Sequence, residues 1–270
     1  MNDSLKKLQF NDAIGLEDKK FLCNNSNLKT KIILTCHDTG EVIWEGTNKL
    51  ILPGAGFVAR SLFDLGGSEI TPSYNSYLGL DNTVYTSTPV GTNKTCLFCV
   101  GTDGCGSENS QVWEVDYRKW IQSLVPFQYR PQSKDLNSAQ RGLYFGRKTI
   151  SSYFAYYFKG FDSSPQLVQQ FTDGTPIDST IYSTTSSLPV ETYVTMTMSL
   201  TKYDCRDYFI DTTSIKDARI NTISLCTGWY TTSGGYRFYQ DIRPVTKLNF
   251  PNEPLIDLRK GIDITYQVYF

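Results

Sequence analysis

The chain has 270 residues, of which 26 are Lys or Arg, 27 are Asp or Glu and one is His. The net charge of -1 argues against a protein that coats nucleic acid or an anionic membrane, because such proteins carry clustered excess basic charge. A single His removes the commonest general base and metal ligand from almost the whole chain, so the composition favours a binding or structural protein over an enzyme.

No targeting or membrane-spanning pattern is found along the chain. Residues 1–10 contain no apolar stretch of the kind that a signal peptide needs, and no apolar run approaches the ~18 residues that span a bilayer. We therefore expect a protein made in the cytoplasm, where its seven cysteines stay mostly reduced. Residues 1–30 are interpreted as an N-terminal arm or extension, and residues 31–270 as a single mostly-β domain.

In the first part of this domain, three strand patterns are followed by a helix and two further strands. The helix is expected over Gly54–Leu65, because an apolar stripe there lies between Pro53 and a Gly-Gly pair at 66–67, the usual asymmetry of helix ends. The alternation of apolar and polar residues marks the strands. They are expected at Lys31–Cys36, Val42–Trp44, Thr47–Leu52, Tyr77–Leu80 and Gln111–Tyr117.

The rest of the domain continues mainly as strands. Ser133–Gly142 is polar and is interpreted as a loop with one turn, and Ser164–Phe171 as a short helix. Tyr153–Lys159 is aromatic on both faces, which is typical of a strand covered on both sides, whereas Val194–Leu200 and Ile262–Phe270 alternate between apolar and polar residues. Further strands are expected at Thr222–Tyr230 and Val245–Phe250. The elements together predict a mainly β protein, an antiparallel β-sandwich or barrel-like domain with one short helix and long loops.

The cysteines supply the strongest metal-binding pattern. Cys96 and Cys99 have a C-x-x-C spacing, and Cys105 follows six residues later, so two or three thiolates could chelate one zinc ion. A second pair of ligands is missing, however, and a redox C-x-x-C normally opens a helix. We therefore predict no metal and no cofactor, and reduced thiols or a local disulfide remain open for these three residues.

Three groups of residues contain the side-chain types that catalysis uses. Cys36, His37 and Asp38 are adjacent, and neighbours on a strand point to opposite faces, so the first two cannot meet. Two pairs of acids have spacings that could serve a glycosidase, but nothing in the sequence marks either pair as buried. These pairs are Glu114 with Asp116 and Asp204 with Asp207. No catalytic residue is predicted.

Tyr and Phe cluster with Arg and Lys in four short stretches of the chain. Such residues are enriched at protein–protein interfaces, where rigid rings supply contact area and Arg supplies bidentate hydrogen bonds. A Tyr-rich core accounts for part of them, and we interpret the excess as contacts with partner subunits. The predicted interface residues are Phe127, Tyr129, Arg130, Tyr144, Arg147, Tyr157, Tyr236, Arg237, Tyr239, Tyr266 and Phe270.

The order of several segments is also informative. Residues 42–63 read VIWEGTNKLILPGAGFVARSLF, and YLGLD follows at 77–81. This arrangement resembles virion structural proteins of tailed bacteriophages, in which a strand with an Asn leads through glycine into a short helix ending in Leu-Phe. The segments LVPFQYR (124–130), YFGR (144–147), YFK (157–159), YQD (239–241) and parts of 248–266 are similar to the same large-phage family.

The resemblance implies a structural component of a virion, in the tail, neck or baseplate. Such a protein assembles in the host cytoplasm with copies of itself, as a ring or multi-copy assembly, and with neighbouring virion proteins. Its C-terminal strand, ending at Phe270, is expected to pair with an open sheet edge in the same chain or in a neighbour.

Two other functions remain open from the sequence. One is a carbohydrate-binding β-domain of a host-recognition fibre or adhesin, with Trp113, Trp120 or Trp229 as the platform for a sugar ring. The other is a tail-associated glycan hydrolase, which would need two acids roughly 5–9 Å apart in a cleft.

Overall fold

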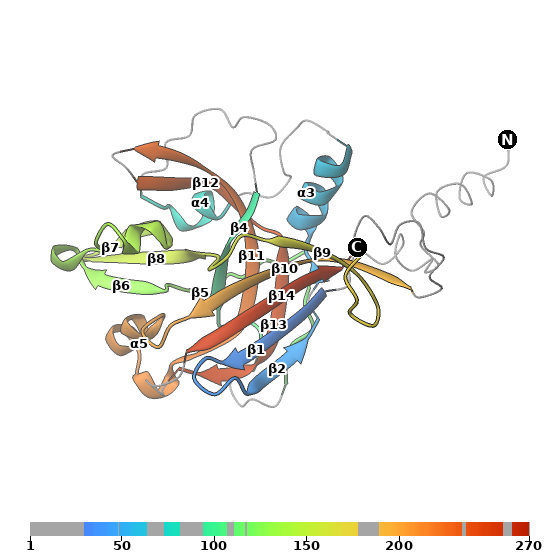
Figure 1. Ribbon diagram of the computed structural model, residues 1–270. Coiled ribbons are helices and arrows are strands. Elements are labelled where there is room, and N and C mark those ends of the chain that lie inside the picture. The colour runs from blue at the N-terminus through green and yellow to red at the C-terminus, as the bar shows by residue number, and fades with distance from the viewer. Residues whose placement is uncertain are drawn as a thin grey trace.

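The structure is a computed structural model that describes residues 30–47, 49–63, 73–81, 94–106, 111–116, 118–177, 189–233, 236–255 and 261–269. Two antiparallel sheets pack face to face (Figure 1), which confirms the predicted mainly β fold. The expected N-terminal arm, apart from Thr30, and Phe270 lie outside the described residues. No helix within the described ranges is both long and apolar enough to cross a membrane.

The smaller sheet has five strands, and the last strand of the chain lies at its centre. Its strands, in spatial order, are β2 (Val42–Gly46), β1 (Thr30–Cys36), β14 (Ile262–Tyr269), β10 (Val190–Leu200) and β9 (Gln166–Phe171). The expected C-terminal strand therefore pairs within its own chain, with β1 on one side and β10 on the other.

The larger sheet has nine strands and is buried on both faces along part of its width. Its main path runs through β3 (Lys49–Leu50), β13 (Thr246–Pro254), β11 (Arg219–Ser233), β4 (Lys94–Gly101), β8 (Tyr153–Gly160) and β6 (Gln128–Pro131). Three more strands pair beside this path: β12 (Tyr236–Pro244) with β11, β5 (Leu124–Val125) with β4, and β7 (Tyr144–Ile150) with β8.

Strand alternation explains how the two cores form. In β4, Phe98 and Val100 point toward the small sheet and join the core between the sheets, whereas Leu97 and Cys99 join a second core on the opposite face. From the small sheet, the first core receives the buried residues of β1, β10 and β14, such as Tyr266. The predicted strand at 153–159, aromatic on both faces, is β8, and it too contributes residues to both cores.

Short helices and loops cover the second core. In α4 (Tyr74–Leu78), the Tyr74 ring stacks on Trp120 with centroids 4.7 Å apart, and the side-chain oxygen of Asn75 accepts a hydrogen bond from the backbone N–H of Ile242. The sequence predicted a strand at Tyr77–Leu80, which is wrong. Ser73 caps the helix by accepting from the N–H of Ser76, and Gly79, with a φ of 58°, ends it.

Other elements also differ from the prediction. The described residues contain three α-helices rather than one: α3 (Leu52–Phe63), which matches the expected helix, α4, and α5 (Arg206–Thr212). The short helix predicted at Ser164–Phe171 is wrong, because these residues form β9 at the sheet edge. In the region expected as strand Gln111–Tyr117, the described residues form only an isolated bridge, between Val112 and Cys105.

Candidate functional site

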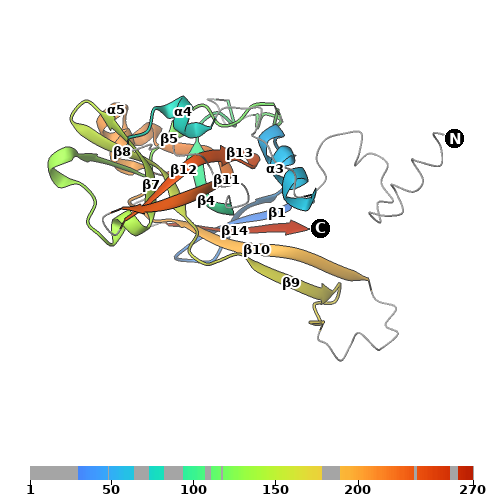
Figure 2. The ribbon, with the colours of Figure 1, turned by 90° about the horizontal axis from the view of Figure 1, so that it is seen from above.

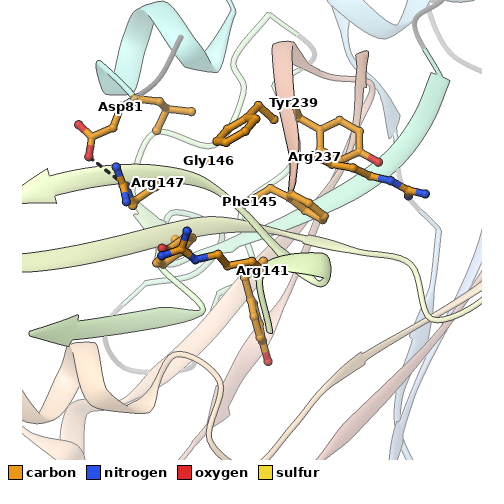
Figure 3. A pocket seen from close by; sticks show the side chains of 11 residues that line it. Asp81, Arg141, Phe145, Gly146, Arg147, Arg237 and Tyr239 are labelled. Carbon is orange, nitrogen blue, oxygen red and sulfur yellow. Dashed lines mark ion pairs between the residues drawn. The ribbon is translucent and has the colours of Figure 1, made fainter. Parts of the chain in front are cut away.

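A pocket of about 110 Å³ lies between strands β7 and β12 of the large sheet (Figure 3). Three arginines line it: Arg141 from a short 3-10 turn (Gln140–Gly142), Arg147 from β7 and Arg237 from β12. The pocket wall also includes the carboxylate of Asp81, from the turn after α4, and the aromatic rings of Phe145 and Tyr239.

The backbone of β7 gives the pocket its shape. Gly146 has a φ of +66°, and a Cβ atom there would lie 2.3 Å from the ring of Phe158. A residue with a Cβ would need both this positive φ and a shift of the buried Phe158 ring, so glycine is the residue that fits without rearrangement. The next residue, Arg147, lays its guanidinium over the ring of Phe154, 4.2 Å from the centroid.

The ion pairs in the pocket differ in length. Arg141 makes a close pair with Asp135, with Nη2 and Oδ2 2.7 Å apart. Arg147 is held more loosely, with its Nε 3.4 Å from Oδ2 of Asp81 and its Nη1 3.7 Å from Oδ2 of Asp135. The Nε atom of Arg147 is buried and has no hydrogen-bond acceptor among the described residues. A buried donor of this kind costs about 1–3 kcal/mol when it stays unpaired.

The opposite wall is aromatic. The rings of Phe145 and Tyr239 meet edge to face, with centroids 4.6 Å apart and planes at 73°. Burial raises the pKa of Tyr239, so its hydroxyl stays protonated at neutral pH. Arg237 lies over the ring of Tyr230 at 4.8 Å, and its interaction with the Tyr239 hydroxyl opposes part of the rise in the pKa of that group.

The pocket is therefore a site of excess positive charge. Three guanidinium groups line it, and two carboxylates, those of Asp81 and Asp135, partner them. Figure 3 shows the Arg147 and Arg237 guanidinium groups at opposite sides of the pocket, with the rings of Phe145 and Tyr239 between them.

A buried polar network fixes one wall of this pocket. Tyr144 lines the pocket, and its hydroxyl donates to Oδ1 of Asp204 at 2.7 Å. The other carboxylate oxygen of Asp204 is 2.9 Å from Nζ of Lys159, and both side chains are almost fully buried. Burial beside Asp204 raises the pKa of Tyr144. The burial of Asp204 is not marked in the sequence, and Asp207, its expected acid partner, is exposed on α5.

A second candidate surface lies at the edge of the small sheet. Leu167 pairs with Val194, so it points to the same face as Met196 and Tyr266, which the large sheet buries. The Leu167 side chain is nevertheless 64% exposed, because the large sheet does not extend over β9. In Figure 2 the β9–β10 pair extends past the end of β14.

The predicted interface residues divide into a buried and an accessible group. Five rings belong to the cores and offer little surface to a partner: Phe127, Tyr129, Tyr144, Tyr157 and Tyr266. Their contacts lie within the chain, as in the stack of Tyr129 on Tyr153 at 4.6 Å.

The remaining predicted interface residues are more accessible or undescribed. Arg130, Arg147 and Tyr239 are half-buried, and Arg237 is exposed. Tyr236 lies in β12, but its side chain, like Phe270, is outside the described residues. Four of the predicted residues meet in one place, since Tyr144, Arg147, Arg237 and Tyr239 all line the arginine pocket.

The cysteine motif does not form a common ligand set. Cys96 donates to the carbonyl of Gly228, Cys99 lies 3.7 Å from the sulfur of Cys226, and Cys105 is buried in another loop. No group of three or more His, Cys, Asp or Glu side chains able to hold a metal occurs in the described part of the chain. All the described cysteines are free thiols, and burial raises the pKa of Cys96 to about 11.

The other sequence candidates are scattered. Cys36 is buried, whereas His37 is exposed and pairs instead with Asp263, with Nδ1 and Oδ2 2.9 Å apart. Of the three expected sugar platforms, Trp229 is buried and Trp120 is half-buried and stacked on Tyr74, while Trp113 is 49% exposed.

Sequence reasoning missed the roles of Asp81, Arg141 and Leu167, and it named Asp204 only as a candidate acid with no sign of burial. Asp81, Asp204 and Leu167 acquire their roles from partners distant in sequence, as Asp204 does from Lys159, 45 residues away, so no local spacing identifies them. Arg141 pairs with Asp135, six residues earlier in the chain. The only local signal was the glycine between two large residues in Tyr-Phe-Gly-Arg.

No family model matches the chain, and neither a curated protein nor a solved structure matches it. The function is therefore inferred from the residues and their geometry.

Proposed function

We propose that the chain is a structural subunit of a tailed-bacteriophage particle, in its tail, neck or baseplate. It acts by assembling with copies of itself and with neighbouring virion proteins, without a catalytic role of its own. The resemblance of residues 42–270 to large-phage structural proteins supports this proposal. The observation that carries it is the exposed Leu167 side chain on the inward-facing side of the β9–β10 edge.

This edge has the properties of a contact surface. Leu167 belongs to the inner face of the sandwich by its register, yet nothing within the described residues covers it. Full burial of a Leu side chain is worth about 1.5–3 kcal/mol, so covering the exposed two thirds of this one would contribute roughly 1–2 kcal/mol to assembly. A subunit that supplies the missing cover would complete the sandwich at this edge.

Particle composition tests the proposal. Particles would be purified from the host culture that makes the chain, and its copy number measured by quantitative mass spectrometry. We expect a fixed copy number in each particle. Absence of the wild-type chain from purified particles would refute the proposed function.

The role of the β9–β10 edge is tested with matched variants. Leu167→Asp places a charge in the contact, whereas Gln166→Asp places the same charge on the opposite face of the same strand, where the side chain is also exposed. We expect Leu167→Asp to lower incorporation at least tenfold and Gln166→Asp to leave it unchanged, with thermal unfolding showing that both variants fold. Equal incorporation of the two variants contradicts the contact.

Carbohydrate binding remains the second candidate because Trp113 is accessible. A sugar platform usually combines several accessible aromatic and polar groups, whereas Trp229 is buried and Trp120 is half-buried and stacked on Tyr74. A glycan array with the wild-type chain and Trp113→Ala tests it: specific binding that the substitution abolishes supports this function, and no binding rejects it.

A further inference from the structure

We propose that a second cavity, beside α5, binds residues 17–20 from the N-terminal arm of a neighbouring copy of the chain. This inference rests on the proposed function, since it names the segment and the site through which copies assemble. The cavity, here called the α5 groove, is lined by residues of β6, of the 3-10 turn Gln132–Lys134 and of α5. It shares no residue with the arginine pocket or with the β9–β10 edge.

The α5 groove carries charges of both signs. It has a volume of about 290 Å³, and α5 supplies Asp207 and Asp211, which lie one helical turn apart on the same face. Arg130 and Lys134 line the groove from β6 and the turn. Within the described ranges none of these four side chains forms an ion pair. An occupant with an acid and a base would pair with both sets of charges, whereas a simple anion or cation would pair with one set only.

Tyr129 gives an independent sign of a ligand. Its side chain lines the groove, is nine-tenths buried and stacks on Tyr153, yet its hydroxyl has no hydrogen-bond partner among the described residues. Burial and the nearby Asp211 carboxylate raise the pKa of Tyr129, so the hydroxyl stays protonated at neutral pH. An ammonium group paired with Asp211 could donate a hydrogen bond to this oxygen.

The N-terminal arm contains a segment of matching charge. Residues 15–21 read GLEDKKF, and the two acids at 17 and 18 are the only adjacent acidic residues in the chain. Two lysines follow them directly. In an extended segment, alternate side chains share a face and are about 6–7 Å apart, so each face presents one acid and one base. The acid would pair with the cations of the groove, and the base with its carboxylates.

Apolar groups flank the charges on both partners. Ile210, also on α5, lines the groove and is 48% exposed. In the arm, Leu16 precedes the charged residues and Phe21 follows them. Contact of either side chain with Ile210 would add apolar burial to the ion pairs, which contribute little when they stay exposed to water.

The reach of the arm selects a neighbouring copy over the same chain. The arm joins β1 at Thr30, which pairs with Val268 near the C-terminal end of β14, and Figures 1 and 2 both show this end of the molecule opposite α5. Ten residues separate Lys20 from Thr30, and they span at most about 33–36 Å. A compact domain of ~240 residues is about 45 Å across, so the segment falls short of the groove of its own chain.

A contact between opposite ends of two copies is head-to-tail. Each copy then offers one arm and one groove, and the contact repeats until a ring closes or a filament grows. The α5 groove thereby supplies a specific contact for the ring or multi-copy assembly expected of a virion subunit.

A charge swap tests this inference. Self-association of the full chain is measured by sedimentation velocity at low ionic strength over a range of concentrations. Lys19→Glu/Lys20→Glu in the arm and Asp207→Lys/Asp211→Lys in the groove should each weaken association about tenfold. The chain with all four changes should regain it, because both partners are then reversed. A wild-type chain that stays monomeric, or a combined variant that regains nothing, overturns the proposal.

Matched variants exclude an effect of net charge alone. Lys6→Glu/Lys7→Glu makes the same charge change elsewhere in the arm and should leave association unchanged. Combined with the groove variant, it restores the net charge without restoring the contact, so association should stay weak. Rescue by this combination would reject residues 17–20 as the occupant. Thermal unfolding checks that each variant folds.

The two proposals can fail separately. A chain that is present in particles but shows no charge-swap rescue keeps the proposed function and loses the α5 groove as a contact. A chain that associates through the groove but is absent from particles keeps the contact and refutes the virion role.

Discussion

Removal of the Asp204 carboxylate is the most direct test of how the large sheet is held together beneath the pocket. This carboxylate accepts four hydrogen bonds of 2.7–3.0 Å. The donors are Gln128, Tyr144, Lys159 and the backbone N–H of Thr201. In Asp204→Ala the buried Lys159 ammonium would keep only one acceptor, a backbone carbonyl.

The expected loss of stability follows from that geometry. Breaking a buried ion pair by deleting one partner costs about 3–5 kcal/mol, because the other charge stays buried without compensation. Since domains are stable by about 5–15 kcal/mol, this is a large part of the total. At roughly 2–4 °C per kcal/mol for a large domain, the melting temperature of Asp204→Ala should fall by about 6–20 °C.

Urea and thermal unfolding, followed by circular dichroism, measure this loss. Asp207→Ala is the matched control, because Asp207 is an exposed acid on the neighbouring helix α5 and should cost less than about 1 kcal/mol. The double variant Asp204→Leu, Lys159→Met removes both charges and should recover part of the stability. A loss below about 1 kcal/mol in Asp204→Ala would refute the reasoning.

Three further predictions concern other parts of the chain. Gly146→Ala should lower the free energy of unfolding, measured in urea, by at least about 2 kcal/mol, because Gly146 has a positive φ and a Cβ atom would clash with Phe158. Gly174→Ala should lower it less, because Gly174 also has a positive φ but has open space around it. The hydrogen bond with Asp263 raises the pKa of His37 above 6.5. Its stabilising effect is therefore complete below pH 6.5 and is lost as the pH rises through the folded-state pKa, so His37→Gln should destabilise more at pH 5.5 than at pH 9. If His37→Gln destabilises the chain more at pH 9 than at pH 5.5, the pKa of His37 is not raised by folding. Burial raises the pKa of Cys96 to about 11, so about one Cys96 thiol in a thousand is ionised at pH 8. Cys96 should therefore stay unmodified by iodoacetamide at pH 8 in the folded chain. Rapid labelling of Cys96, detected by peptide mass spectrometry, would contradict this.

The elements that the sequence predicted well are those with one face in the core and one outside. β1, β10 and β14 have this environment, so their inward residues alternate with polar ones. β8 was also predictable, because burial on both faces requires large apolar residues at nearly every position. In these strands the local pattern and the tertiary environment agree.

The failures have equally physical causes. β9 lies at a sheet edge, where Gln166 and Leu167 are both exposed, so no alternation marks the strand. α4 is too short for a helical period, and its capping residues, Ser73 and Gly79, are the signals that define it. The aromatic–arginine clusters could not be divided between core and surface from the sequence, because a two-sided sheet needs many rings for its own cores, and Phe127 lies in one of them.

The position of β14 decides which experiments can separate folding from assembly. This strand contributes Ile262, Ile264 and Tyr266 to the core and holds β1 and β10 together, so the small sheet would be split by its removal. Deletion of residues 262–270 would therefore prevent folding whether or not the strand touches a partner, and its absence from particles would say nothing about assembly. Leu167, which lies on the same face but is uncovered, can be changed without opening the core. Loss of incorporation in Leu167→Asp, with unchanged thermal unfolding, is thus the result that would assign a contact surface to this sheet.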